Sequence, residues 1–223
     1  MDKAKNALDF YVLCNRLKKV KRTGWLKWKV RGRKESIGDH VYGAQMLAYA
    51  MKYSYPEEFK NINIDRVIMM LSIHELGEII IGDLTPFQTS AQEKHEREVE
   101  AVKEVLSYIG CPPELFDLWL EFENRTTEDA WFAYFCDKCE CDIQSKIYDE
   151  ERRVNLKKLA SNESTNDVKV KELLEDAKKC PYPWSTMWIK YGLEKYGYSE
   201  PFKEVSNYCL THKILSKKKK VNN

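Results

Sequence analysis

Apolar residues recur at intervals of three and four along most of the chain, which is the spacing of a helix with one buried face. At the start, Leu8, Val12, Leu13 and Leu17 form such a stripe and predict a first helix. Alternation of apolar and polar residues never continues beyond a few positions, so no strand is expected. The pattern predicts an all-α protein.

Helix boundaries are marked by capping residues, glycines and prolines. The run Ser36-Ile-Gly-Asp39 is typical of a capping box that opens a helix through Met51. Loops are expected near residues 22–24 and 31–33. Further helices are expected from near Asp65 through His74, over 91–109, over 115–123, from Thr127 onward, and in two or three segments after 166. Since there is no repeat or linker, we expect residues 1–223 to form one domain.

Composition excludes several classes of protein. The 223 residues carry a formal net charge of only +2, which gives no reason to expect a nucleic-acid partner. No apolar run approaches the roughly 20 residues of a membrane span, and no signal peptide is visible. Seven cysteines, an odd number, indicate free thiols in a reducing compartment, so we expect a cytoplasmic location. The basic tail at 216–223, with Lys217 to Lys220, is interpreted as a solvated segment.

Two of the four histidines stand next to acids inside predicted helices, as Asp39-His40 and His74-Glu75. A lone helical histidine is more often structural than a ligand. Here, though, His74 and Glu78 are four apart and are expected to share a helical face. Charged groups on an otherwise apolar face are costly unless they pair or bind a metal. The cluster therefore predicts a metal site.

At these residues the sequence resembles the HD-domain phosphohydrolases, and within them the 5′-deoxynucleotidase (YfbR-like) branch. The resemblance covers about residues 8–150, which leaves C-terminal helices over about 151–215. Four stretches carry it: Lys21-Arg-Thr-Gly-Trp25, Glu35-Ser-Ile-Gly-Asp-His40, His74-Glu-Leu-Gly-Glu-Ile-Ile-Ile-Gly-Asp83-Leu-Thr-Pro86 and Asp137-Lys-Cys-Glu140. The segment Glu93-Lys-His-Glu96 between them is also similar to the family.

The resemblance implies a single-domain helical bundle around a divalent metal. Its ligands would be His40, His74, Glu75 and Asp137. It further implies that Glu78 and Asp83 serve the water near the phosphate or a second metal ion. Arg22 would pair with the substrate phosphate and Trp25 would press against the sugar or base.

The chain departs from the family in two places. Glu75 stands where the family has Asp, and its extra methylene moves the carboxylate by about 1 Å or more. The loop Thr85-Pro-Phe-Gln-Thr-Ser90 lacks a lysine that is common in YfbR-like proteins. The metal stays open among Mn, Co, Mg, Fe, Ni and Zn, because carboxylates suit the harder ions and imidazoles the others.

These residue types suit phosphoester hydrolysis. Two carboxylates bring a divalent site close to neutral before a phosphate arrives, and the metal polarises phosphoryl oxygens. A nearby acid, Glu78, would accept the proton of the attacking water.

Other signals favour structural roles. A zinc site at Cys136, Cys139 and Cys141 lacks a second ligand pair downstream. His95 is interpreted as a helix-surface residue. Aromatic residues from Trp184 to Tyr198 are typical of a core, with a homodimer surface as the alternative.

The function expected first is hydrolysis of deoxyribonucleoside 5′-monophosphates. The alternatives are hydrolysis of another phosphorylated nucleotide, such as an alarmone, and a metal-binding regulatory module with weakened catalysis. Glu78 and Asp83 argue against the last, because a structural metal site would not need them.

Overall fold

The computed structural model describes residues 2–85, 88–159, 161–197 and 199–215, and within them it confirms the predicted all-α fold. No strand forms among these residues; the nearest feature is an isolated bridge between Lys21 and Ser36. Two compact units can be distinguished: the described residues of Met1–Leu26 with Lys34–Asp137, and those of Lys27–Arg33 with Lys138–Asn223. Because each unit is described by itself, the single-domain organisation stays a prediction.

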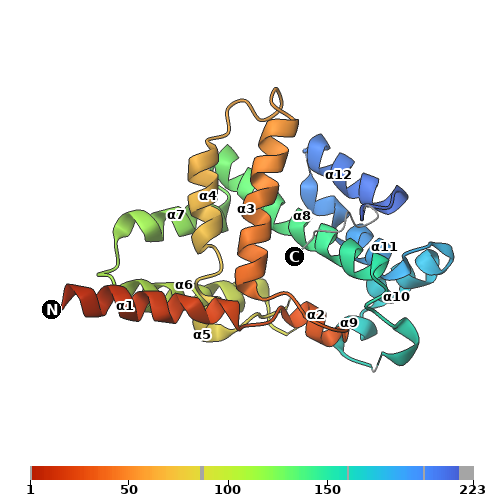
Figure 1. Cartoon of the computed structure of the whole chain (residues 1–223), viewed down its shortest axis with the longest axis horizontal. Coiled ribbons are helices and arrows are strands. Elements are labelled where there is room, and N and C mark those ends of the chain that lie inside the picture. Colours follow the sequence, from red (N-terminus) through yellow and green to blue (C-terminus); the bar gives the residue numbers. More distant parts are fainter. Residues whose placement is uncertain (1, 86–87, 160, 198, 216–223) are drawn as a thin grey trace, which may run out of the picture. The chain divides into compact units, whose positions relative to one another are not determined.

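The first unit contains most of the long helices (Figure 1). Their bounds are α1 Lys3–Cys14, η1 Asn15–Lys18, α2 Thr23–Lys27, α3 Ile37–Ser54, α4 Ile64–Ile73, α5 Glu78–Ile81, α6 Ala91–Ser107, α7 Pro113–Asn124 and the first part of α8 Glu128–Glu150. Helices α3 and α4 pack side by side, as do α4 and α7, and α1 lies against α6.

One apolar cluster joins the helices of the first unit. Its fully buried members come from α1, η1, α3, the α4–α5 turn, α5, α6 and α7: Leu13, Leu17, Ile37, Leu76, Ile79, Val102, Val105, Leu106 and Trp119. Burial of a side chain of this size stabilises the fold by about 1.5–3 kcal/mol. The cluster therefore anchors the start of α3 and the α4–α5 turn, which carry the polar residues described below.

The predicted capping box of α3 is confirmed. The Ser36 side chain accepts from the backbone N–H of Asp39, and the Asp39 carboxylate accepts from the backbone N–H of Ser36 at 2.8 Å. This reciprocal pair satisfies two donors at the helix start and sets the position from which His40 enters the unit.

Two details of the first unit differ from the sequence-based expectation. Leu8 and Val12 are 63% and 62% exposed, so only Leu13 and Leu17 of the predicted stripe are buried. The described part of α1 packs by its C-terminal end, which leaves the earlier apolar residues exposed. The loop expected at 22–24 begins a short helix instead, α2, which starts at Thr23.

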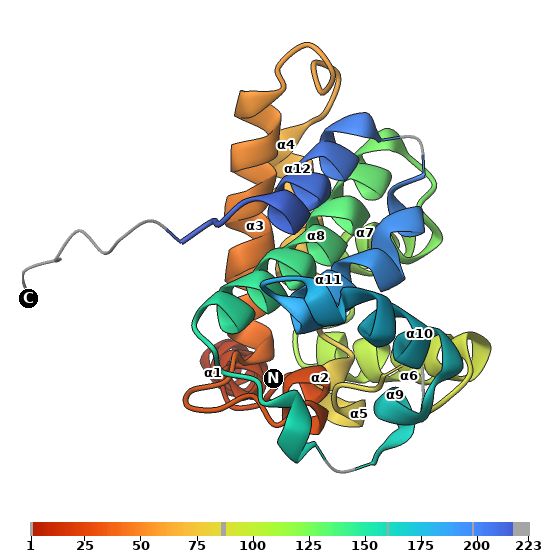
Figure 2. The same ribbon diagram turned by 90° about the vertical axis from the view of Figure 1, so that its right-hand side faces the viewer.

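The second unit consists of short helices around the latter part of α8 (Figure 2). They are η2 Leu156–Lys158, α9 Glu163–Asn166, α10 Val168–Asp176, η3 Ala177–Lys179, α11 Pro183–Gly192, η4 Leu193–Tyr196 and α12 Glu200–Thr211. Helix α11 packs between α10 and α12. Buried Asp142 of α8 accepts hydrogen bonds from Tyr196 Oη at 2.5 Å and Lys195 Nζ at 3.1 Å, which ties α8 to η4.

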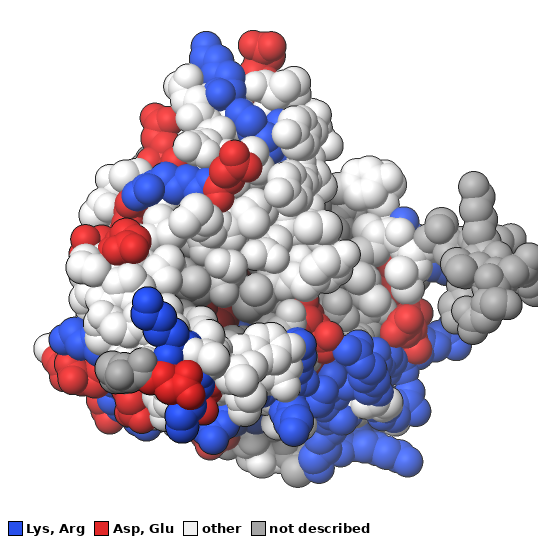
Figure 3. Space-filling model, turned by 60° about the vertical axis from the view of Figure 1, so that its left-hand side comes forward, with Lys and Arg blue, Asp and Glu red and all other residues white. Residues whose placement is uncertain are grey.

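Within the described part of the chain, every helix is too short or too polar to cross a membrane. The predicted basic tail Lys217 to Lys220 and Pro86 of the loop 85–90 lie outside the described residues. Figure 3 shows Lys and Arg gathered on one part of the visible face, among otherwise mixed charges. The run 16–34 contains 10 Lys and Arg residues and no Asp or Glu.

Candidate metal centre

Four side chains of the first unit converge on one point. His40 comes from α3, His74 caps the C-terminus of α4, Glu75 follows it directly, and Asp137 lies on α8. One ligand atom from each lies within 4.8 Å of the others. The fold therefore brings together the four residues predicted as ligands, from positions that are 97 residues apart at the extremes.

The distances place two imidazoles around two carboxylates. His40 Nε2 lies 3.0 Å from Asp137 Oδ1 and 3.7 Å from Glu75 Oε1. His74 Nε2 lies 3.6 Å from Glu75 Oε1 and 4.0 Å from Asp137 Oδ1. The two rings meet edge to face with their centroids 5.5 Å apart. This donor set of two nitrogens and two oxygens is one that divalent transition metals and Mn²⁺ accept.

The His74 ring is oriented for a metal. Its Nδ1 lies 2.8 Å from the Leu71 carbonyl oxygen, and because a carbonyl only accepts, Nδ1 carries the proton. Nε2 then presents a lone pair, yet it is buried and has no hydrogen-bond partner. Burial also lowers the pKa of His74, which favours the neutral, metal-binding form. A buried orphan acceptor is costly, so these residues fit a metal ion.

Glu75 contributes an ionised carboxylate to the cluster. Arg22 Nη1 donates to its Oε1 at 3.1 Å. Burial acts to raise the pKa of this carboxyl, but its electrostatic interactions with His74, Arg22 and His40 outweigh that effect and lower the pKa to about 2. The Glu that replaces the family's Asp thus reaches both the cluster and the arginine predicted to contact phosphate.

The backbone between His74 and Glu78 differs from the predicted continuous helix. They were predicted to share one helical face, but α4 ends at Ile73 and α5 begins only at Glu78. Gly77 stands in the turn between them, where an added Cβ would lie 3.4 Å from Glu98 of α6. That distance is an ordinary van der Waals contact and Gly77 has α-region backbone angles, so the turn rather than a helical repeat directs both side chains.

Glu78 is buried beside the cluster, and its Oε2 has no hydrogen-bond partner. Burial raises its pKa well above the ordinary value, and the negative charges of Glu75 and Asp83 add to this, while Arg22 and Lys94 oppose it. A carboxylate whose pKa is raised binds a proton more readily than an ordinary one, which suits a proton acceptor.

Asp83 makes a different kind of contact. Its carboxylate accepts from the backbone N–H of Thr23, and its carbonyl accepts from Thr23 Oγ1 at 2.7 Å. Thr23 is the first residue of α2, so Asp83 holds the start of the segment that carries Arg22 and Trp25. The catalytic role assigned to Asp83 stays a prediction, and the positioning contact adds to it.

Trp25 is buried, with only 1% of its surface exposed. Its indole Nε1 donates to Glu35 Oε2 at 2.8 Å, and the Arg22 amide donates to the Glu35 carbonyl at 3.2 Å. A contact between Trp25 and a nucleotide stays a prediction. In the described structure, its ring forms part of the support for Arg22.

Sequence reasoning missed three supporting residues. Glu35 is a buried acid in the stretch that indicates His40 as a ligand. Thr23 falls in the loop expected at 22–24, and Lys94 falls in a segment that resembles the family. Glu35 lies two residues before the first residue of α3, and its burial follows from its hydrogen bond with Trp25, which only the fold defines. Lys94 and Thr23 act through contacts that only the fold defines.

Side chains judged structural by their sequence context have local partners. His95 stacks on Trp119 with centroids 6.2 Å apart, and its Nδ1 lies 3.8 Å from Glu123. All seven cysteines are free thiols. Burial raises the pKa of Cys209 to about 11, which makes this thiol unreactive near neutral pH.

Comparisons with known proteins agree with the site. The family model HD_3, described as an HD domain, matches residues 14–179. The curated protein named 5′-deoxynucleotidase HDDC2 from Homo sapiens is 33% identical over 150 residues, 66% of this chain and 70% of that protein. The protein of the same name from Dictyostelium discoideum is 34% identical over 151 residues, 66% of this chain and 79% of its own length.

Solved structures show the same fold at lower identity. A conserved hypothetical protein from Pyrococcus furiosus superposes with a TM-score of 0.64 at 24% identity, over 91% of this chain and 98% of its own. The PH0347 protein from Pyrococcus horikoshii superposes with a TM-score of 0.62 at 23% identity, over 91% and 97% of the two chains. At this identity the likeness concerns the fold alone.

Proposed function

The chain belongs to the HD domain family, and from that premise we propose that it is a metal-dependent 5′-deoxynucleotidase, which hydrolyses deoxyribonucleoside 5′-monophosphates to deoxynucleoside and phosphate. One observation carries the proposal: the buried, unpartnered Nε2 of His74 faces a cluster of two carboxylates and a second imidazole, with buried Glu78 nearby. The names of the relatives support the choice of substrate.

His40, His74, Glu75 and Asp137 would hold the metal. A divalent ion bound there supplies Lewis-acid polarisation of phosphoryl oxygens and makes water more acidic. Glu78 would accept the proton of the attacking water, because its raised pKa makes it a stronger base than an ordinary carboxylate. The position of Glu78 beside the cluster, rather than in it, supports this division of roles.

Arg22 would orient the substrate phosphate, since the guanidinium fork matches phosphate oxygens. Its contact with Glu75 supports this, because it holds the guanidinium at the edge of the metal cluster. Lys94 pairs with Glu98 at 3.1 Å, and its positive charge also acts on Glu78. The run 16–22, which lies in the same unit as the cluster, holds five Lys and Arg and no acid, and this charge favours approach of an anionic substrate.

The test is phosphate release from a panel of nucleotides by the metal-stripped protein after addition of Mn²⁺, Co²⁺ or Mg²⁺. We expect release from deoxyribonucleoside 5′-monophosphates with at least one metal, and much less from 3′-monophosphates. Release only from an alarmone or another phosphorylated nucleotide would reassign the substrate. A protein that binds metal but releases phosphate from no ester would be a regulatory module.

A further inference from the structure

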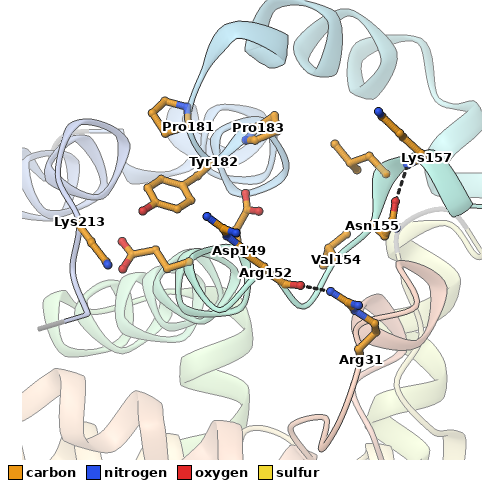
Figure 4. A pocket seen from close by; sticks show the side chains of 12 residues that line it. Arg31, Asp149, Arg152, Val154, Asn155, Lys157, Pro181, Tyr182, Pro183 and Lys213 are labelled. Atoms are coloured by element: carbon orange, nitrogen blue, oxygen red, sulfur yellow. Dashed lines mark hydrogen bonds between the residues drawn. The ribbon is translucent and has the colours of Figure 1, made fainter. Parts of the chain in front are cut away.

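A cavity separate from the cluster lies wholly within the second unit (Figure 4). Its volume is about 680 Å³, which is in the range of pockets that hold small molecules. The end of α8, the segment that follows it, the turn before α11 and Lys213 form its walls, together with Arg31. None of the residues of the metal cluster lines this cavity.

The cavity has an excess of positive charge. Four cationic side chains line it: Arg31, Arg152, Lys157 and Lys213. All four belong to exposed residues. Within the described part of the chain, none of the four forms an ion pair with a carboxylate.

The two acids of the cavity are already engaged by other groups. Asp149 Oδ2 accepts from the Ser185 backbone N–H at 2.8 Å, which satisfies a donor in the first turn of α11. The two oxygens of Glu150 accept from the backbone N–H groups of Ile214 and Leu215, at 2.8 and 2.9 Å. The Lys146 ammonium lies 3.6 Å from Glu150 as well. The acids therefore stabilise the walls, while the four cations have no acidic partner among the described residues.

Arg152 stands where the backbone favours another residue. It follows the end of α8 with φ 56, and its N–H donates to the Asp149 carbonyl at 2.9 Å. Glycine adopts this left-handed conformation at a helix end without strain, and arginine does not. Strain of this kind gathers at functional sites, and here it brings a guanidinium to the cavity.

The walls are also held in place before any ligand arrives. The Arg31 guanidinium donates to the Arg152 carbonyl, and the Arg31 amide donates to the Arg153 carbonyl at 2.9 Å. On the other side, Tyr182 stands between Pro181 and Pro183, with the Lys146 ammonium 3.9 Å from its ring centroid. A fixed wall reduces the ordering cost of binding.

We propose that this cavity binds an anionic small molecule that carries two or more phosphate groups. Four cations beside two satisfied acids call for several negative charges, and the volume exceeds the need of a single orthophosphate. Arg and Lys are the side chains that bind phosphate oxygens most strongly. Tyr182 and the two prolines offer an apolar wall for an attached base or ring.

The test is calorimetric titration of the full chain with tripolyphosphate, pyrophosphate and ATP, in EDTA so that the metal cluster is empty. Arg152→Gly removes one cation and suits the left-handed backbone, so the variant keeps its fold. Lys157→Ala has a neighbour, Lys158→Ala, as matched control, because Lys158 is exposed but does not line the cavity. We expect Arg152→Gly and Lys157→Ala each to weaken tripolyphosphate binding about tenfold, and Lys158→Ala to leave it unchanged.

The arms of the titration separate the alternatives. Equal affinity for tripolyphosphate and ATP would identify a polyphosphate site, and tighter binding of ATP would identify a nucleotide site that uses Tyr182. Binding that survives Arg152→Gly and Lys157→Ala but is lost in His74→Ala would place the anion at the metal cluster and overturn the proposal. Absence of binding by the wild-type chain would also overturn it, without bearing on the nucleotidase activity.

Discussion

Glu78 is the residue of the site to which we assign the role of proton acceptor. Replacement of Glu78 by Gln keeps its size but removes its capacity to accept a proton. We expect kcat for deoxynucleotide hydrolysis to fall about 10²- to 10⁴-fold, while metal content stays at the wild-type level. Phosphate release and metal analysis on the same preparation check this, and full activity in the variant would show that another group is the base.

The raised pKa of Glu78 also predicts a pH dependence. A base acts in its deprotonated form, so activity falls as pH decreases through its pKa, and that pKa lies above the ordinary 4.5. We expect the acidic limb of the pH profile of kcat/KM to lie above pH 4.5, and to disappear in the residual activity of Glu78→Gln. An unchanged limb in the variant would assign it to a different group.

Glu75 tests the departure from the family pattern. Glu75→Asp shortens the side chain and draws the carboxylate away from Arg22, whereas Glu75→Gln removes its charge. We expect the Asp variant to change metal affinity less than tenfold and the Gln variant to lower it about 10- to 100-fold or more. Equal affinity in the Gln variant and the wild type, by metal titration, would exclude Glu75 as a ligand.

At the scale of elements, Asp83 holds the start of α2 through its hydrogen bonds with Thr23. Asp83→Asn keeps an oxygen that can accept from the Thr23 amide, and Asp83→Ala does not. If the residue positions Arg22, KM should rise about tenfold or more in the Ala variant and little in the Asn variant, because a lost hydrogen bond to a charged group costs this much. If Asp83 acts in catalysis as a carboxylate, both variants should lose kcat to the same extent.

The cap of α3 gives a matched test of stability. Ser36→Ala removes the acceptor for the Asp39 amide and should lower the free energy of unfolding by about 1 kcal/mol. Ser54 ends the same helix, is exposed, and serves as control, so Ser54→Ala should change stability far less. Denaturant unfolding of both variants measures the difference, and equal values would contradict the capping role.

Local rules predicted the elements whose stability is local. Ser36 and Asp39 are three residues apart, so their capping box could be seen in the sequence, and the four metal ligands were predicted from a motif. The turn between His74 and Glu78 could not be predicted, because it interrupts a run whose apolar pattern continues as helix. Helix α1 packs differently from its stripe because Leu8 and Val12 find no cover among the described residues. Glu35 was missed for the same reason, since its partner Trp25 is defined by the fold.

At the scale of the whole molecule, buried Asp142 links stability to pH. Burial raises its pKa from the ordinary 3.8, although Lys195 and Tyr196 oppose the effect. The folded chain therefore holds the proton more tightly than the unfolded chain, and the free energy of unfolding falls as pH rises above 3.8. Asp142→Asn should remove this fall, which is at most about 1.4 kcal/mol per pH unit.

Unfolding curves of Asp142→Asn and wild type between acid and neutral pH check this, with exposed Asp176→Asn as control. The control should keep the wild-type pH dependence. A steeper fall in stability with pH in Asp142→Asn than in the wild type would contradict the assigned sign.

We propose a divalent metal centre at which the protein hydrolyses deoxynucleotides, and the direct test measures metal content together with turnover. The same preparation of wild type and of Asp137→Ala is analysed for bound metal and for phosphate release from a deoxyribonucleoside 5′-monophosphate. We expect the wild type to bind divalent metal and to release phosphate, and we expect Asp137→Ala to lose both the bound metal and the phosphate release. Wild-type phosphate release that persists after complete removal of metal would contradict it.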